Sequence, residues 1–166
     1  MRYIPLGSSG ILVSELGFGT WGIGGVTEGA TSYGPTDDRE SEKALEKSFD
    51  EGVNFFDTAT AYGKSEEIIG RTFNGSKRGQ VVIATKVGIS KHLGSQDFSE
   101  QAIVLSLEYS LKRLKTDYID LLQLYNPPLN NLSIEDTLAT LNKLKDKGLI
   151  RAIGVSLKSP AEGLIA

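Results

Sequence analysis

The feature that most constrains the fold of this chain is a regular alternation of short apolar runs with longer amphipathic segments. The short runs are rich in strand-forming residues and predict five strands. The longer segments repeat apolar residues at three- and four-residue spacing, which predicts helices between the strands. Strands that alternate with helices form a parallel sheet. The sequence therefore predicts an α/β protein with four strand–helix repeats, a fifth strand and the beginning of a fifth helix.

The predicted strands cover residues 16–20, 53–56, 81–85, 119–124 and 152–155. The predicted helices cover residues 38–51, 66–73, 99–115 and 134–147. Ser65 and Ser133 are predicted to be the N-caps of the second and fourth helices. The fourth helix is predicted to bury an apolar stripe that consists of Ile134, Leu138, Leu141 and Leu144.

A β-hairpin is predicted ahead of the first strand of the sheet. Residues 2–6 and 11–13 flank the sequence GSSG, which is typical of a tight turn. A hairpin in this position can close one end of a barrel.

The segment LGFGTWGIGG contains a G-x-G-x-x-G pattern at Gly17, Gly19 and Gly22. In a dinucleotide-binding fold, this pattern needs a helix that begins at its last glycine and holds the pyrophosphate at its N-terminus. Here further glycines and a loop follow, up to about Asp38. We therefore interpret the glycines as residues that let a strand pack closely and its loop bend. A Rossmann dehydrogenase is the less favoured hypothesis.

Each predicted strand ends on a polar or reactive residue, and these residues are Thr20, Asp57, Lys86, Tyr125 and Ser156. The carboxyl ends of parallel strands lie at one edge of a sheet, and in a barrel they surround one mouth. The sequence therefore predicts an active site at this edge.

Asp57, Lys86 and Tyr62 form a chemically coherent group near this edge. A buried lysine needs a carboxylate to remain charged, and an ammonium lowers the pKa of a nearby phenol from its usual value of about 10. A phenol tuned in this way suits donation of a proton to a carbonyl oxygen while a hydride arrives at the carbon. Three simpler interpretations stay open: Asp57 caps a turn, Lys86 is a solvated loop residue, and Tyr62 only packs.

Composition excludes several other classes. The chain has no cysteine and one histidine, His92, so disulfides, thiolate chemistry and a histidine-rich metal site are excluded. Acidic and basic residues are interspersed and the net charge is -3, which argues against a nucleic-acid partner. No apolar run is long enough to cross a bilayer, and the N-terminus lacks the apolar core of a signal peptide. We expect a cytoplasmic protein without a membrane partner, and His92 in a solvated loop.

Several segments resemble, in order and spacing, the first five β–α units of the aldo-keto reductase family. They are LGFGTWGIGG, FFDTATAYGKSEEIIGR, VVIATKVG, SLEYSLKRLKTDYIDLLQLYNPP and LIRAIGVS. The resemblance implies a (β/α)8 TIM barrel, of which residues 1–166 supply an N-terminal part as a single domain. It also implies NADPH-dependent reduction of an aldehyde or ketone to an alcohol, with a small-molecule carbonyl compound as the substrate.

The resemblance also assigns roles to individual residues. The catalytic residues would be Asp57, Tyr62, Lys86 and Tyr125, with Tyr62 as the proton donor. Cofactor binding is implied for Thr20, Asp57 and Ser156. Substrate binding is implied for Trp21, Tyr62, Tyr125 and Asn126.

Two positions depart from the pattern of the family. Tyr125 occupies the place of the family's histidine, and a phenol does not titrate near neutrality as histidine does. Leu157 follows Ser156 where the family usually has asparagine. The loss of the asparagine amide should weaken binding of the nicotinamide carboxamide.

The chain stops after five predicted strands, whereas a (β/α)8 barrel needs about 250 residues. We therefore expect a truncated fragment that is inactive alone, or that works by pairing with a second copy or with a complementary half-barrel. The alternative hypothesis is a non-catalytic nucleotide-binding or regulatory protein on the same scaffold.

Overall fold

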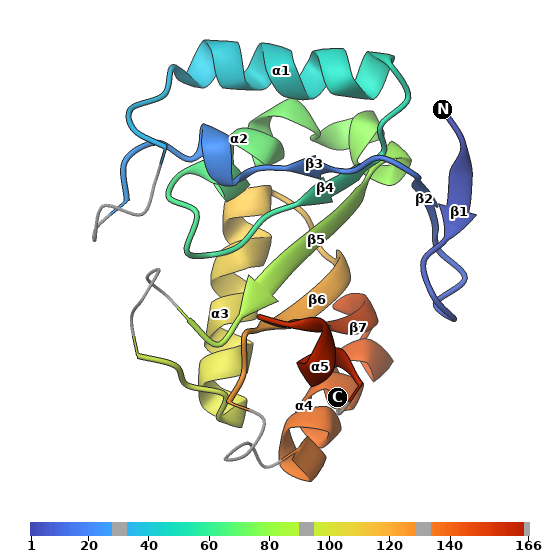
Figure 1. The fold of residues 1–166 in the computed structure, drawn as a ribbon, viewed down its shortest axis with the longest axis vertical. Coiled ribbons are helices and arrows are strands. Elements are labelled where there is room, and N and C mark those ends of the chain that lie inside the picture. The colour runs from blue at the N-terminus through green and yellow to red at the C-terminus, as the bar shows by residue number, and fades with distance from the viewer. Residues whose placement is uncertain (28–32, 90–94, 129–133, 165–166) are drawn as a thin grey trace.

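A computed structural model describes residues 1–27, 33–89, 95–128 and 134–164 of the chain. The centre of the molecule is a five-stranded parallel sheet with its strands in chain order (Figure 1). These strands are β3 (Phe18–Gly19), β4 (Phe55–Asp57), β5 (Val82–Val87), β6 (Ile119–Tyr125) and β7 (Ile150–Ser156). The predicted α/β fold with a parallel sheet is thus confirmed.

The predicted hairpin is present and consists of β1 (Tyr3–Pro5) and β2 (Leu12–Ser14). Asn54 ties it to the sheet, because its side chain accepts a hydrogen bond from the Ser14 main-chain N–H at 2.6 Å and donates one to the Leu12 carbonyl at 3.1 Å. Asn54 directly precedes β4, so the hairpin lies beside the starts of the strands, at the right in Figure 1. The hairpin therefore closes the end of the sheet opposite to the predicted active site.

Helices follow the strands in alternation, as predicted. They are α1 (Asp38–Asp50), α2 (Ser65–Thr72), α3 (Glu100–Leu114), α4 (Ile134–Asp146) and α5 (Pro160–Gly163), with two 3-10 helices, η1 (Trp21–Ile23) and η2 (Gly75–Gln80). Leu45 of α1, Ile68 of α2, Leu107 of α3 and Leu141 of α4 lie in one buried core with side chains of the strands. Four helices therefore cover a single face of the sheet.

Side chains alternate between the two faces of the sheet along each strand. Phe56 of β4 and Ile83 of β5 belong to the core that the strands share with the helices, on what we call the outer face. A second buried cluster joins the opposite, inner face to the hairpin, and its members are Ile11, Val13, Val82, Ala84, Leu121 and Ala152. Further along the strands, Asp57, Lys86 and Gln123 meet on this inner face. The inner face is thus apolar at the hairpin end and polar at the carboxyl ends of the strands.

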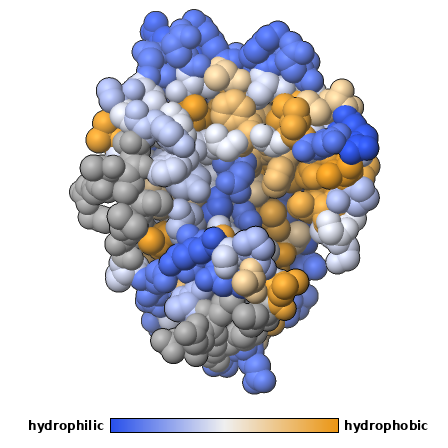
Figure 2. All heavy atoms as spheres, viewed as in Figure 1, coloured by the Kyte–Doolittle hydropathy of each residue, from blue (hydrophilic) through white to orange (hydrophobic). Residues whose placement is uncertain are grey.

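Figure 2 shows the surface of the side that is seen in Figure 1. Apolar side chains gather over the hairpin, where Leu12 is 59% exposed and Ile4 is 39% exposed. Hydrophilic atoms occupy the centre of the view. The surface therefore shows the same division between a hairpin region and a polar region.

The start of α2 differs from the prediction. Ser65 was expected to cap this helix, but it is the first helical residue, and Lys64 occupies the N-cap position without a side-chain cap. The Ser65 hydroxyl is buried and forms a hydrogen bond of 2.8 Å with the Thr58 hydroxyl instead. The physical reason is that the loop after β4 turns Ser65 toward the sheet, where its hydroxyl needs an internal partner.

The apolar stripe predicted for α4 is confirmed only in part. Leu141 and Leu144 are buried, whereas Leu138 is 43% exposed. Four residues at helical spacing cover a wider arc than the surface that α4 presents to the core, so one of them faces solvent. The predicted cap Ser133 and the side chain of Ile134 lie outside the described part of the chain, as does His92.

Candidate active site

Asp57, Lys86 and Tyr62 meet on the inner face near the carboxyl ends of the strands, as predicted. Asp57 is the last residue of β4, Lys86 lies in β5, and Tyr62 lies in the loop between β4 and α2. The Lys86 ammonium donates hydrogen bonds to Asp57 Oδ1 at 2.5 Å, to the Thr58 carbonyl at 2.8 Å and to the Tyr62 hydroxyl at 3.4 Å. One buried ammonium therefore connects the carboxylate to the phenol. The interpretation of Lys86 as a solvated loop residue is wrong.

Two carboxylates act on Lys86, Asp57 on the inner face of the sheet and Glu66 on the outer face. Burial lowers the pKa of Lys86 from 10.5, and Asp57 and Glu66 oppose this change. Glu66 is only 1% exposed and lies on the outer face, where it accepts hydrogen bonds from the Thr85 hydroxyl at 2.6 Å and from Arg113 Nε at 2.7 Å. Because two anions flank the lysine, its side chain can carry a positive charge although it is almost fully buried.

The pKa of Tyr62 changes in the direction opposite to the prediction. Burial raises this pKa above 10.0, and the Tyr125 and Asp57 side chains raise it further. The predicted lowering by Lys86 is therefore wrong, because a phenolate in this half-buried position would lose its hydration and would face the Asp57 carboxylate. The consequence is that Tyr62 stays protonated at neutral pH, which is the form that can donate a proton.

Gln123 of β6 belongs to the group but was not predicted. Its amide donates a hydrogen bond to Asp57 Oδ2 at 3.0 Å, so the two oxygens of Asp57 have different partners. The signal that could have found it is its polar side chain inside the run IDLLQLY, where Asp120 is the other strongly polar residue. Its parity with Tyr125, two residues later in the same strand, places both on the inner face.

Aromatic rings gather beside the phenol of Tyr62. The ring of Trp21, in η1, stacks on Tyr62 at a centroid distance of 6.1 Å, and the ring of Tyr125 meets Tyr62 edge-on at 6.3 Å. Burial raises the pKa values of both Tyr62 and Tyr125, and a side-chain hydrogen bond between the two phenols is a smaller contribution. Tyr33 meets Trp21 edge-on at a centroid distance of 5.1 Å. The predicted substrate-binding aromatics are thus adjacent to the predicted proton donor.

Two glycines let the loop after β3 contact the loop after β4. A Cβ atom on Gly24 would lie 1.9 Å from the Tyr62 carbonyl oxygen, and one on Gly63 would lie 2.3 Å from the Gly24 oxygen. The main-chain N–H of Lys64 donates to the Gly24 carbonyl at 2.9 Å. After Gly22 the chain continues from the short 3-10 helix η1 into this contact, and no α-helix begins there. The interpretation as closely packed glycines is confirmed for Gly17, where a Cβ atom would lie 2.9 Å from Phe55 Cδ1, but not for Gly19, where such an atom would have no neighbour within 4 Å.

Thr20 is fully buried beneath the carboxyl end of β4. Both its hydroxyl and its main-chain N–H donate hydrogen bonds of 2.9 Å to the Asp57 carbonyl oxygen. In the structure, Thr20 therefore fixes the main chain that carries the Asp57 carboxylate.

Asn126 and Ser156 lie together at the ends of β6 and β7. The Asn126 main-chain N–H donates to the Ser156 carbonyl at 2.8 Å, and the Ser156 hydroxyl lies 3.5 Å from Asn126 Oδ1. Asn126 has a φ of 46°, an uncommon conformation for a residue with a side chain. Gln96 stabilises this conformation, because its amide donates to the carbonyls of Tyr125 at 3.0 Å and Asn126 at 2.8 Å. Gln96 was not predicted, because only the folded loop brings it to this position.

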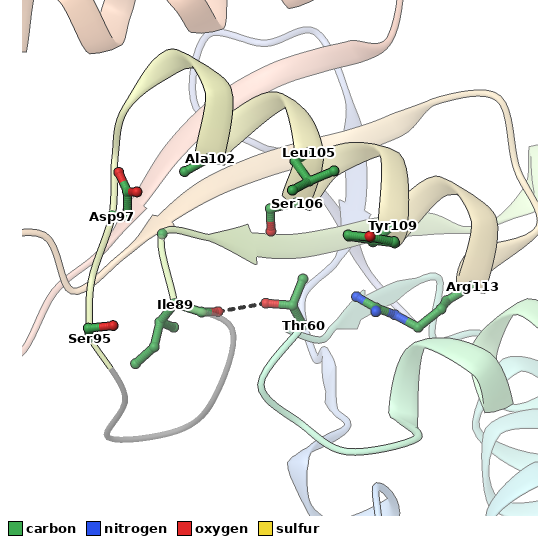
Figure 3. Close-up of a pocket in the computed structure, with 10 residues that line it drawn as sticks. Thr60, Ile89, Ser95, Asp97, Ala102, Leu105, Ser106, Tyr109 and Arg113 are labelled. Carbon is green, nitrogen blue, oxygen red and sulfur yellow. Dashed lines mark hydrogen bonds between the residues drawn. The ribbon is translucent and has the colours of Figure 1, made fainter.

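A separate cavity of about 310 Å³ lies between the loop after β4, the loop after β5 and α3 (Figure 3). Thr60 closes one side, and its hydroxyl donates to the Ile89 carbonyl at 2.8 Å. Arg113 points toward Thr60 from α3, and the side chain of Tyr109 lies one turn away from it. Asp57, Lys86 and Tyr62 do not line this cavity. The inner-face group is therefore the better candidate for the active site.

Two further features are absent from residues 1–27, 33–89, 95–128 and 134–164. No helix there is both long and apolar enough to cross a membrane. Groups of three or more His, Cys, Asp or Glu side chains that could hold a metal ion are also not found among these residues.

Comparison with known proteins agrees with the geometry. A profile of the Aldo/keto reductase family matches residues 15–164. The chain belongs to this family. It is 43% identical over 163 residues to the aldo-keto reductase YhdN of Bacillus subtilis (strain 168), covering 94% of this chain and 47% of that protein. It also superimposes on an aldo-keto reductase structure from Pseudomonas aeruginosa with a TM-score of 0.84 and 40% identity, covering 99% of this chain and 63% of that one.

The relatives are longer than this chain and differ in their described functions. The chain spans about half the length of the curated relatives it matches, as the 47% coverage of YhdN illustrates. A probable voltage-gated potassium channel subunit beta of Arabidopsis thaliana is 39% identical over 154 residues, covering 89% of this chain and 44% of that protein. Membership of the family and the superposition show that the chain has the fold of aldo-keto reductase TIM barrels, of which it covers a part.

Proposed function

We propose that this aldo-keto reductase reduces an aldehyde or ketone to an alcohol with NADPH, and that Tyr62 donates the proton. The observation that carries the proposal is the chain of contacts from Asp57 to the Lys86 ammonium and from there to the Tyr62 hydroxyl. The three groups lie at the strand ends where α/β barrels place their chemistry. They also supply what the reaction needs from a protein, namely a proton donor and a positive charge beside it.

The proton transfer can be followed atom by atom. When bound, the nicotinamide supplies the hydride that forms the new C–H bond at the carbonyl carbon. The Tyr62 O–H bond breaks as its proton passes to the carbonyl oxygen, which leaves a tyrosinate. The Lys86 ammonium lies 3.4 Å from the Tyr62 hydroxyl oxygen and stabilises the negative charge that develops there. Asp57 stabilises the ammonium in turn. Burial, which keeps Tyr62 protonated beforehand, also makes this ammonium more effective than it would be in water.

The residues at the strand ends fit a nicotinamide nucleotide chemically. Asp57 is 34% exposed and can accept hydrogen bonds from ribose hydroxyls, and Thr20 fixes its main chain. The Ser156 hydroxyl, together with Asn126 beside it, offers the donors and acceptors that a carboxamide needs. We propose Thr20, Asp57 and Ser156 as residues of the cofactor site. The preference for NADPH over NADH follows the family expectation and is tested by titrating both.

The aromatic group supports the substrate side of the proposal. The rings of Trp21 and Tyr125 pack against Tyr62, and Asn126 directly follows Tyr125 in the chain. We propose that these three residues line the substrate pocket. Tyr125 can donate a second hydrogen bond to the carbonyl oxygen. It does so without a change of charge near neutral pH, because burial raises its pKa above 10.0.

The experiment that tests the proposal combines cofactor binding with turnover. NADPH and NADH are titrated while the fluorescence of Trp21, the only tryptophan, is followed, and cofactor oxidation is then measured with a panel of aldehydes and ketones. We expect saturable quenching, and we expect Tyr62→Phe to lower kcat by about 10²–10⁴-fold, the usual contribution of a general acid. Tyr109→Phe, on the exposed face of α3, is the matched control. Turnover that survives in Tyr62→Phe contradicts the assignment of the proton donor.

Assembly is part of the proposal. In the described part of the chain, β3 and β7 each pair with one strand only, so the sheet has two open edges. We propose that activity requires these edges to be covered, either by a second copy or by a complementary half-barrel, and that a monomer of these 166 residues is inactive. Activity is measured over a range of concentrations alongside the mass from sedimentation. Wild-type-like turnover by a monomer contradicts this part.

Location is also part of the proposal. We propose that the protein is cytoplasmic, because reduced nicotinamide cofactors are available in the cytoplasm. We also propose that it has no nucleic-acid or membrane partners. Cell fractionation with an antibody against the chain checks this, and recovery in the membrane fraction contradicts it.

A second candidate function is a cofactor-binding regulatory protein without turnover. The observation that favours it is Tyr125 at the histidine position of the family, together with the similarity to potassium channel beta subunits. Saturable NADPH binding without oxidation by any carbonyl compound supports this candidate and contradicts the enzyme.

A further inference from the structure

We infer that Gln123 is a positioning residue of the active site, because its amide holds one oxygen of Asp57 so that the other oxygen faces Lys86. The inference rests on the proposed function, which needs Asp57 to stabilise the lysine ammonium. Neither the family pattern quoted above nor the sequence assigns a role to Gln123.

The two oxygens of the Asp57 carboxylate have different hydrogen-bond partners. Oδ1 accepts from Lys86 Nζ at 2.5 Å and Oδ2 accepts from Gln123 Nε2 at 3.0 Å. A carboxylate that is one-third exposed can rotate about its terminal bond and exchange either partner for water. Donors on both oxygens restrict that rotation. An amide is suited to this role because it donates a hydrogen bond without adding a charge that would compete with Lys86.

The second argument is the register of the strands. Gln123 pairs with Lys86 on the neighbouring β5, and Asp57 pairs with Ala84 on the other side of β5. The short side chain of Ala84 leaves room on the inner face for Gln123 to reach across β5 to Asp57. The sheet thus places the amide, the ammonium and the carboxylate on neighbouring strands of one face.

The third argument is the space left by Gly154 on β7, which pairs with Gln123. A Cβ atom at Gly154 would lie 3.1 Å from Gln123 Cγ and 3.1 Å from Leu121 Cδ1, closer than most real contacts. Gly154 is not among the glycines with positive φ, so its main chain does not require glycine. What glycine provides here is room for the stem of the Gln123 side chain.

The fourth argument is that packing alone does not direct the amide. Gln123 and Gly154 line a cavity of about 450 Å³ between the turn of the hairpin and β7. A glutamine beside such a cavity has other orientations available. The hydrogen bond to Asp57 is therefore what fixes its direction.

The test uses Gln123→Met, which keeps the length of the side chain and removes the amide, with Gln101→Met on the exposed face of α3 as the matched control. The first readout needs no turnover: the pKa of Lys86 is measured by titrating its ¹³Cε resonance in lysine-labelled protein, assigned with Lys86→Arg. Asp57 raises this pKa. A less firmly held Asp57 raises it less, so we expect a lower Lys86 pKa in Gln123→Met and no change in Gln101→Met.

The second readout is steady-state kinetics in the assembled protein. We expect Gln123→Met to lower kcat by about 10- to 100-fold, as misplacement of a catalytic group does, with KM for the carbonyl compound nearly unchanged. A wild-type Lys86 pKa together with a wild-type kcat overturns the inference. If no carbonyl compound is reduced by the wild type, the proposed function fails, while a lowered Lys86 pKa in Gln123→Met still supports the positioning role.

Gly154→Ala provides a second route if Gln123→Met does not fold. The added methyl group presses on the Gln123 stem without removing the amide, so we expect a smaller decrease of the Lys86 pKa and of kcat. A folded Gly154→Ala protein in which both quantities equal the wild type counts against the inference.

Discussion

Two carboxylates on the same sheet, Asp57 and Asp120, are paired with cations in different ways. Asp120 is fully buried in β6 and accepts from Arg78 at 2.7 Å, from the Ile83 main-chain N–H at 3.0 Å and from Arg151 at 2.6 Å. Asp57 is 34% exposed and is paired with a lysine. The first group lies near the start of its strand and the second at the carboxyl ends of the strands.

The cations explain the difference between the two groups. Arginine does not lose its proton in proteins and offers several donors in a fixed plane, which suits a permanent structural link. Arg78 also lies over the ring of Tyr118 at 4.1 Å. Lysine changes its pKa readily when buried, and burial lowers the pKa of Lys86. The Asp120 group therefore suits a structural link within the sheet, whereas the Asp57 group has the composition that the proposed proton transfer needs.

The largest expected effect is on stability, in Arg78→Met. This change leaves the buried Asp120 carboxylate without its most buried cation, so we expect the free energy of unfolding to fall by about 3–5 kcal/mol. Urea denaturation followed by circular dichroism measures the loss. A decrease of less than about 1 kcal/mol, the range of exposed ion pairs, would place the Asp120 group among surface interactions instead.

Asp57→Asn tests the other carboxylate through pH dependence. Asp57 raises the pKa of Lys86, so its neutralisation lowers that pKa further. Lys86 then loses its proton at a lower pH, and the fall of kcat/KM on the alkaline side should move to lower pH. We also expect kcat at neutral pH to decrease by about 10²-fold, the effect of a weakened charge at the reacting oxygen. An unshifted alkaline limb in the pH–rate profile contradicts the link between Asp57 and Lys86.

Tyr125→His adds a group that titrates near neutral pH at the carboxyl ends of the strands, beside Asp57, and leaves the Asp120 group unchanged. Burial raises the pKa values of Tyr62 and Tyr125 above 10.0, so neither phenol changes protonation near neutrality. The wild-type profile of kcat/KM should therefore be flat between about pH 6 and 8. The variant should acquire a new limb near about pH 6.5, the ordinary pKa of histidine. A flat profile in the variant would remove position 125 from the reaction.

The smallest expected effect is that of Arg151→Gln. Arg151 is 50% exposed, and Asp120 keeps Arg78 and the Ile83 main-chain N–H as partners. We expect a loss of about 0–1 kcal/mol of stability, as for exposed ion pairs. Thermal unfolding at low and high salt measures it. A loss as large as that in Arg78→Met would mean that both arginines are essential to the Asp120 group.

The sequence predicted the fold and the central part of the site for a physical reason. Strand and helix periodicities are local patterns, and they place Asp57 and Lys86 near strand ends that a parallel sheet gathers at one edge. The group of Asp57, Lys86 and Tyr62 could therefore be predicted without coordinates.

What the sequence did not predict depends on packing across the sheet. Gln123 reaches Asp57 over an intervening strand, and Arg78 meets Asp120 across 42 positions of the chain. The direction of the pKa change of Tyr62 depends on its burial and on the neighbouring Tyr125 and Asp57 side chains. Such effects need the distances between elements, which periodicity does not supply.

The different roles of Lys86 and Arg78 can be tested by measuring NADPH oxidation with the carbonyl panel. The wild type, Lys86→Met and Arg78→Met are compared, each at a temperature at which circular dichroism shows it to be folded. We expect equal kcat for the wild type and Arg78→Met, and a loss of about 10²–10³-fold for Lys86→Met, because Lys86, and not Arg78, stabilises charge at the reacting oxygen. Turnover retained by Lys86→Met, or an equal loss in both variants, would contradict the claim that the two ends of the sheet have different roles.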